Sequence, residues 1–89
     1  MFLHFNIKIF GLVQGVFFRV SAKKEADRLK LSGLARNDTD GSVYIEVEGD
    51  KDSLDRFISW CKKGPPQAKV EKVQYDNGEI KNYQQFKIN

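Results

Sequence analysis

Two kinds of apolar repeat alternate along this chain, and their order restricts the folds open to it. Apolar residues occupy every second position from Leu3 to Ile9, which predicts a strand with one buried face and with the polar residues between them, including His4, on the exposed face. From Phe18 to Leu31 the apolar residues follow helical spacing, and Gly33 is predicted to end that helix.

A β-hairpin and a second helix are predicted next. Residues 34–37 form a short strand, residues 38–41 have the composition of a turn, and apolar residues alternate again from Val43 to Val47. Asp50 is placed to cap a helix whose apolar residues repeat at i, i+3, i+4 and i+7, starting at Leu54.

The C-terminal part is predicted to add two strands. Gly64-Pro65-Pro66 ends the second helix, and a fourth strand runs from Lys69 to Tyr75, where an interrupted alternation favours a β-bulge or an irregular edge. After a turn at residues 76–78, a short last strand is expected between Tyr83 and Ile88.

The resulting order, β-α-β-β-α-β with a tail, predicts an α+β fold. Two helices with apolar stripes and strands with one buried face favour a ferredoxin-like two-layer sandwich, with both helices on one face of an antiparallel sheet. Right-handed crossovers place strand one between strands three and four, with strand two beyond strand three. With 40% hydrophobic residues, residues 1–89 are expected to form a single domain. The fold hosts many unrelated activities, so it does not assign one.

Composition favours a cytoplasmic protein without membrane or nucleic-acid partners. Fifteen Lys and Arg against twelve Asp and Glu give a net charge of +3, which is too diffuse for a nucleic-acid-binding stripe. The single cysteine, Cys61, excludes an intrachain disulfide and lies in an apolar helical repeat, where a buried small side chain is expected. No segment has the length of a membrane span or the pattern of a signal peptide.

The segment Gly11-Leu12-Val13-Gln14-Gly15-Val16-Phe17-Phe18-Arg19 has the features of an anion-binding turn. Gly15 allows the positive φ that turns successive N–H groups into one concavity, and Arg19 supplies a guanidinium that matches phosphate oxygens. The same pattern also fits an ordinary strand-to-helix turn with a solvated arginine. No Gly-Lys-Ser/Thr follows, which excludes a nucleotide P-loop, and Val13 stands where a thiol-dependent phosphatase would carry its nucleophile.

Two motifs resemble the signatures of the acylphosphatase family. Residues 11–19 carry every fixed position of the first signature, in which the position of Phe17 is variable. Residues 33–43, with Gly49 at the expected distance, carry the second signature, except that Leu34 replaces the usual aromatic residue. The resemblance covers nearly the whole chain and includes the order of its elements.

The resemblance implies an enzyme that hydrolyses the carboxyl–phosphate anhydride of acyl phosphates to a carboxylate and inorganic phosphate, without a metal ion or an organic cofactor. It implies that Arg19 binds the phosphate and that Asn37 orients the attacking water. It also implies that backbone amides bind the phosphate, namely those of Gln14, Gly15, Val16, Phe17 and Phe18. Inorganic phosphate or sulfate is expected to bind the same site, and a monomer is expected to act on its small-molecule substrate.

Such a minimal site is chemically sufficient. The leaving carboxylate has a conjugate acid with a pKa of about 4, so it needs no general acid. Phosphoryl transfer through a loose transition state requires alignment and charge stabilisation, which a guanidinium and N–H groups supply. Our hypothesis for the proton acceptor is the substrate's own phosphate oxygen. Of Phe17 and Phe18, one is expected in the core and the other at the mouth of the pocket.

Three alternatives fit parts of the sequence. Asn37 considered alone would more often stabilise a turn than act in catalysis. RNA-recognition modules share the order of elements, but residues 41–48 carry one aromatic and two acidic residues where such modules carry stacking side chains. A domain that binds an acyl or carbamoyl phosphate without turnover would keep the same motifs, although the presence of both Arg19 and Asn37 favours catalysis.

Overall fold

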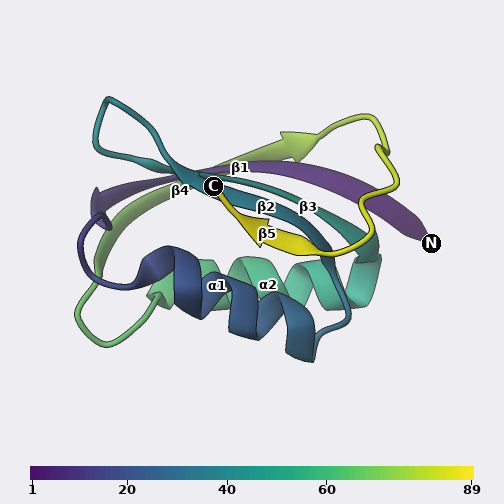
Figure 1. Ribbon diagram of the computed structural model, residues 1–89, viewed down its shortest axis with the longest axis horizontal. Helices are drawn as coiled ribbons and strands as arrows, with labels where there is room; N and C mark the ends of the chain where they lie inside the picture. The colour runs from purple at the N-terminus through teal and green to yellow at the C-terminus, as the bar shows by residue number, and fades with distance from the viewer.

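A computed structural model describes residues 1–89 as a five-stranded sheet with both helices packed against one face (Figure 1). The elements are β1 (Phe2–Leu12), α1 (Phe18–Arg28), β2 (Ser32–Asn37), β3 (Val43–Asp50), α2 (Lys51–Lys63), β4 (Lys69–Asn77) and β5 (Phe86–Ile88). The strand order is β4-β1-β3-β2-β5. The predicted ferredoxin-like α+β fold and the predicted order of its first four strands are confirmed.

The sheet is antiparallel from β4 to β2 and gains one parallel pair at its edge. β5 runs parallel to β2, so the description of the sheet as antiparallel does not extend to this last strand. The reason is that residues 78–85 carry the chain from β4 at one edge across to the opposite edge, where β5 enters in the direction of β2 (Figure 1). The predicted bulge is present, because Phe10 pairs with Lys72 and Gly11 with Val70, which leaves Glu71 as an extra residue in β4.

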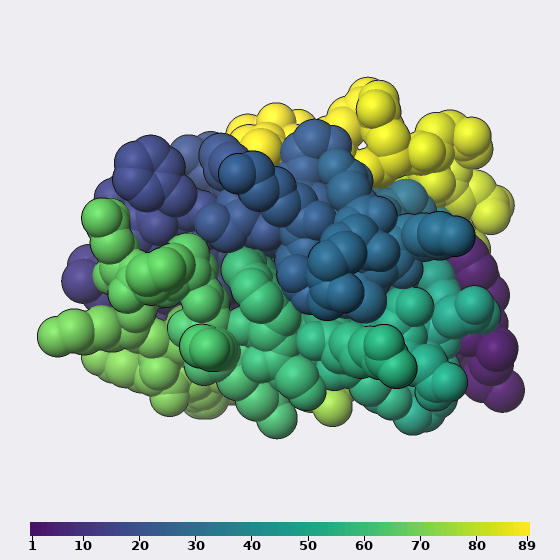
Figure 2. All heavy atoms as spheres, turned by 90° about the horizontal axis from the view of Figure 1, so that it is seen from below, coloured from purple at the N-terminus to yellow at the C-terminus, as the bar shows by residue number.

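The core lies between the sheet and the two helices. It contains 19 buried apolar residues, of which Phe18, Phe57 and Phe86 are the largest with fully buried side chains. Figure 2 shows the two helices side by side over this face of the molecule. Cys61 of α2 is buried here as predicted, and burial raises the pKa of its thiol.

Helix α1 ends at Arg28 rather than near Leu31. Lys30 takes a φ of 61°, and the N–H of Leu31 donates to the carbonyl of Ala26 at 2.8 Å. This pairing, with a left-handed residue just after the helix, is a Schellman motif. The main chain therefore ends the helix without a glycine.

The prediction that Gly33 ends this helix is wrong, because Gly33 lies within β2. Its φ is 152°, and a Cβ at this position would lie 1.8 Å from the main-chain oxygen of Glu46 on β3. Glycine is needed here so that β2 can approach β3 closely enough to pair with it.

The expectation that His4 is exposed is also wrong. His4 does lie on the sheet face away from the helices, but only 1% of it is exposed. Residues 78–85 cross this face, and the ring of Tyr83 stacks on the imidazole with 6.2 Å between centroids. The imidazole Nδ1 lies 2.7 Å from a carboxylate oxygen of Glu48.

Candidate active site

A turn of five residues, 13–17, links β1 to α1 and forms what we call the cradle turn. Gly15 and Phe17 have positive φ values of 74° and 65°, whereas Val16 between them does not. This alternation directs successive N–H groups toward the same side of the chain. The N–H groups of residues 14–17 donate to no acceptor within the protein. The cradle turn thus presents free donors beside the N-terminal end of α1, where the helix dipole also favours an anion.

A cavity of about 240 Å³ opens beside the cradle turn. Its lining is mostly apolar and includes two polar side chains, those of Arg19 and Asn37. The lining residues are Val13, Gly15, Phe17, Phe18, Arg19, Val20, Asn37 and Ile88. The structure therefore brings the two predicted polar side chains, from the start of α1 and the end of β2, to one cavity.

The guanidinium of Arg19 is held by the end of the chain. Its Nη1 donates to the main-chain oxygen of Asn89 at 2.9 Å, and the N–H of Asn89 donates to the carbonyl of Ala35 on β2 at 2.8 Å. The remaining guanidinium N–H groups have no partner in the protein, so they are free to donate to a ligand. Nothing in the tail sequence indicated this contact, which depends on the pairing of β5 with β2.

The side chain of Asn37 is exposed and makes no hydrogen bond within the protein. The turn that follows is held by other groups: Asp40 accepts hydrogen bonds from the hydroxyl and N–H of Ser42, and the Lys8 ammonium lies 2.9 Å from Asp40. Ser42 and Lys8 together keep the pKa of the Asp40 carboxyl well below its usual range. Asn37 is therefore not used to stabilise this turn.

Gln14 has a contact that sequence reasoning missed. Its side-chain amide donates to the carbonyl of Asp38 at 2.8 Å and to that of Ser42 at 2.9 Å. These bonds tie the cradle turn to the hairpin turn that follows Asn37. The available signal was that Gln14 is the one polar side chain between Gly11 and Arg19.

The three apolar residues of the predicted phosphate-binding set serve different purposes. Val16 and Phe18 are buried in the core, and Phe18 packs edge-on against Trp60 with 5.3 Å between centroids. Phe17 instead is 69% exposed and lines the cavity. The expectation that one phenylalanine packs in the core and the other lies at the mouth of the pocket is confirmed. The buried pair anchors the cradle turn to the core.

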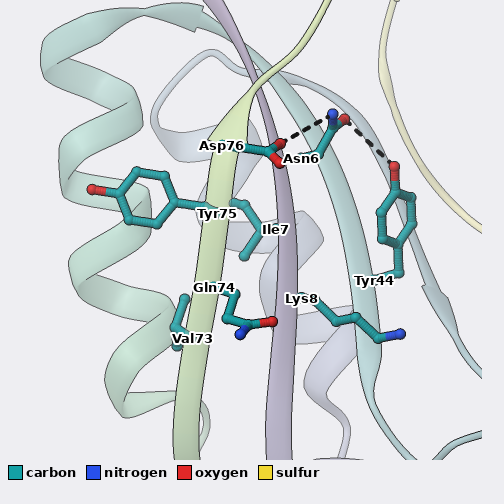
Figure 3. Close-up of a pocket in the computed structure, with 8 residues that line it drawn as sticks. All are labelled: Asn6, Ile7, Lys8, Tyr44, Val73, Gln74, Tyr75 and Asp76. Carbon is teal, nitrogen blue, oxygen red and sulfur yellow. Dashed lines mark hydrogen bonds between the residues drawn. The ribbon is translucent and has the colours of Figure 1, made fainter.

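A larger groove of about 560 Å³ lies on the face of the sheet away from the helices (Figure 3). It contains none of the predicted site residues. The amide nitrogen of Asn6 donates to Asp76 at 3.4 Å, and its amide oxygen lies 3.4 Å from the hydroxyl oxygen of Tyr44 (Figure 3). The polar groups of Asn6, Asp76 and Tyr44 in this groove therefore lie against one another, in contrast to the free donors beside Arg19.

Two further features bear on other kinds of site. The His, Cys, Asp and Glu side chains form no group of three or more arranged to hold a metal ion. Neither helix combines the length and the apolar character required to cross a membrane.

Known proteins are similar to this chain in sequence and structure. The model of the acylphosphatase family matches residues 5–88. An acylphosphatase from Aeropyrum pernix is 46% identical over 84 residues, which cover 89% of this chain and 83% of that one. The crystal structure of an acylphosphatase from Bacillus subtilis matches with a TM-score of 0.95 and 34% identity, covering 100% of this chain and 99% of that one.

An acylphosphatase structure from Coxiella burnetii matches with a TM-score of 0.96 at 34% identity, covering 99% of this chain and 93% of that one. The two structures match over the whole fold, and the residues matched by the family model include both sequence motifs. The chain therefore belongs to the acylphosphatase family, and it is a hydrolase of that class.

Proposed function

We propose that this enzyme hydrolyses acyl phosphates through a site in which Arg19 and the N–H groups of residues 14–18 bind the phosphoryl group and Asn37 orients the attacking water. The proposal is supported by the N–H groups of the cradle turn, which have no acceptor in the protein. They lie beside Arg19 at a cavity that Asn37 also lines. All these groups come from one chain, so the monomer suffices as the active form.

The cradle turn is suited to the transition state of phosphoryl transfer. Negative charge is spread over the three non-bridging oxygens of the phosphoryl group, and donors that are already oriented stabilise it without reorganising. Buried Val16 and Phe18 hold the turn in place, and the main chain of Asn89 holds the guanidinium. The loss of one such donor lowers the rate by a factor on the order of 10²–10³.

The bond changes need no group beyond those named. The water oxygen forms a bond to phosphorus, the bond from phosphorus to the acyl oxygen breaks, and the carboxylate leaves with the electron pair. The carbonyl oxygen of the Asn37 amide accepts a hydrogen bond from the water and holds it in line with the breaking bond. A non-bridging oxygen of the substrate takes the proton from water, which gives inorganic phosphate.

The test is phosphate release from benzoyl phosphate by the wild type and two variants. We expect Arg19→Ala to lower kcat/KM by about 10²–10³ and to weaken inhibition by inorganic phosphate. We expect Asn37→Ala to lower mainly kcat, with inhibition by phosphate retained. The matched controls are Arg56→Ala on the exposed face of α2 and Asn77→Ala at the end of β4, both expected to behave as wild type.

Three outcomes would contradict the proposal. Full activity of Arg19→Ala would show that the guanidinium does not take part in binding or hydrolysing the substrate. Binding of phosphate without hydrolysis of any acyl phosphate would favour a sensing domain over an enzyme that uses Asn37. Loss of activity on addition of a chelator would contradict a mechanism that uses only these protein groups.

A further inference from the structure

Part of the cavity has no role in binding the phosphoryl group. Phe17, Val20 and Ile88 line it, and their exposed fractions are 69%, 45% and 39%. Three large apolar side chains exposed around one opening form an apolar surface of the kind that marks a binding site. They come from the cradle turn, the first turn of α1 and β5, so the fold brings them together from distant parts of the chain.

The conformation of Phe17 points to the same conclusion. It has φ 65° and ψ 26°, a left-handed conformation that is uncommon for a bulky side chain. Because its ring is mostly exposed, packing within the protein does not compensate for this strain. Backbone strain of this kind persists at ligand-binding positions. Phe17 also occupies the variable position of the first motif, whereas buried Val16 and Phe18 occupy fixed ones.

The charges around the cavity limit what the apolar side chains can bind. Arg19 is the one charged side chain in the lining, and Asn37 is the one other polar side chain. With Arg19 engaged by the phosphoryl group, a second anionic group on the acyl part would enter an apolar surface without a partner. Moving such a charge out of water without a partner is unfavourable.

We infer that Phe17, with Val20 and Ile88, binds the acyl group of the substrate and makes the enzyme selective for acyl phosphates whose acyl group is apolar and uncharged. The inference rests on the proposed function, because it assigns the acyl end of the same substrate. An aromatic acyl group is the best match, since its ring can pack against the exposed ring of Phe17.

The first test compares benzoyl phosphate with acetyl phosphate in wild type and Phe17→Ala. The two substrates differ in the intrinsic reactivity of their leaving groups. This difference is the same for every variant, so it cancels when the ratio of the two kcat/KM values is compared between variants. We expect this ratio to fall about fivefold in Phe17→Ala, because a ring–ring contact is lost. The matched control is Phe2→Ala at the start of β1, a phenylalanine that is 50% exposed and does not line the cavity. Inhibition by inorganic phosphate is expected to be unchanged in both.

The second test varies the charge of the acyl group. 4-Methylbenzoyl phosphate and 4-carboxybenzoyl phosphate have similar shapes, and their para substituents perturb the leaving group little. We expect wild type to favour the methyl compound by about tenfold or more in kcat/KM, because the carboxylate finds no partner. Binding of phenacylphosphonate, which cannot be hydrolysed at its CH₂–P bond, is measured by calorimetry against methylphosphonate and is expected to weaken in Phe17→Ala.

The outcomes separate this inference from the proposed function. An unchanged benzoyl-to-acetyl ratio in Phe17→Ala, or equal hydrolysis of the methyl and carboxy compounds, overturns the acyl-binding surface and leaves the hydrolysis intact. Failure of wild type to hydrolyse any acyl phosphate, together with Phe17-dependent binding of phenacylphosphonate, overturns the proposed reaction and supports the surface. Failure of both hydrolysis and phosphonate binding overturns both.

Discussion

Two regions of this molecule concentrate polar groups, and they are built in opposite ways. At the cradle turn the N–H groups of residues 14–17 have no acceptor in the protein, and most of the Arg19 guanidinium is free. On the face of the sheet away from the helices, His4, Glu46 and Glu48 are buried beneath residues 78–85 and hydrogen-bonded within the protein. We call these three residues the buried polar cluster.

Glu48 illustrates how the buried polar cluster is saturated. Its carboxylate lies 2.7 Å from the imidazole of His4 and accepts hydrogen bonds from the N–H groups of Lys81 and Tyr83, both at 2.8 Å. Burial would raise the pKa of Glu48, but these hydrogen bonds outweigh it and lower the pKa. The carboxylate is thus stable as an anion and anchors the segment that covers it.

The carboxylate of Glu46 has its hydrogen-bonding capacity filled by side-chain donors instead. It accepts from the Lys81 ammonium at 2.8 Å and from the hydroxyls of Tyr83 at 2.6 Å and Tyr44 at 2.8 Å. Burial opposes ionisation, but these bonds lower the pKa of Glu46 to about 2. Burial and the hydrogen bond to Glu46 raise the pKa of Tyr44 and of Tyr83 to about 12. A polar group whose bonds are complete stabilises the fold, whereas a region with unused donors is available to a ligand.

The largest effect on stability is expected from Glu48→Ala. Removing the carboxylate leaves His4 and two main-chain N–H groups of the covering segment without their acceptor, so the free energy of unfolding should fall by about 3–5 kcal/mol. Urea unfolding measures the change, with the exposed Glu79→Ala as the control. Activity per folded molecule should be retained. Loss of activity without loss of stability would show that Glu48 takes part in the reaction. The buried polar cluster would then not be a purely structural region in contrast to the cradle turn.

Acid should destabilise the protein through the same cluster. The folded pKa of Glu46, about 2, lies below its ordinary value of 4.5, so its contribution is complete above pH 4.5 and is lost as the pH falls toward 2. This difference corresponds to about 3 kcal/mol. Urea unfolding between pH 2 and 7 should show stability decreasing below about pH 4.5, and Glu46→Gln should flatten that decrease. Equal slopes in the two proteins would mean that Glu46 is not the stabilising anion.

A smaller effect, about 1–2 kcal/mol, is expected from Gln14→Ala. The side-chain amide nitrogen of Gln14 makes two hydrogen bonds, and its loss removes one of the two donors to each of the carbonyls of Asp38 and Ser42, which keep the N–H groups of Gly41 and Asp38, respectively. We also expect lower activity, because the hairpin turn next to Asn37 loses its tie to the cradle turn. The control is the exposed Gln67→Ala, and both unfolding and phosphate release are measured. Wild-type stability would show that these bonds form equally well with water.

The sequence could predict the features that depend on local pattern. Apolar periodicity predicted the helices and strands because each element buries one face against the same core. The motif at residues 11–19 predicted a turn with positive φ at Gly15 and with Arg19 beside it, and the structure has both features, because both are local. Asp50 was correctly placed at the start of α2, but its side chain makes no capping hydrogen bond there.

Contacts between distant segments could not be predicted in the same way. Alternation in β1 placed His4 on the correct face but carried no information about residues 78–85, which cover it. The bond from Arg19 to Asn89 joins residues 70 apart and exists because β5 pairs with β2. Two glycines with similar sequence signals, Gly33 and Gly64, also differ in role: Gly64 follows α2 as predicted, whereas Gly33 permits close strand pairing.

The smallest effect distinguishes two left-handed residues at opposite ends of α1. Lys30 and Phe17 have φ values of 61° and 65°, and both are exposed, so glycine should relieve strain at either position and raise the free energy of unfolding by about 0.5–1 kcal/mol. Lys30→Gly should leave kcat/KM unchanged, because its strain serves only to end the helix. Phe17→Gly should gain the same stability but lose its preference for aromatic acyl phosphates. If Phe17→Gly kept that preference, strain at the cradle turn would have no more functional meaning than strain at the helix end.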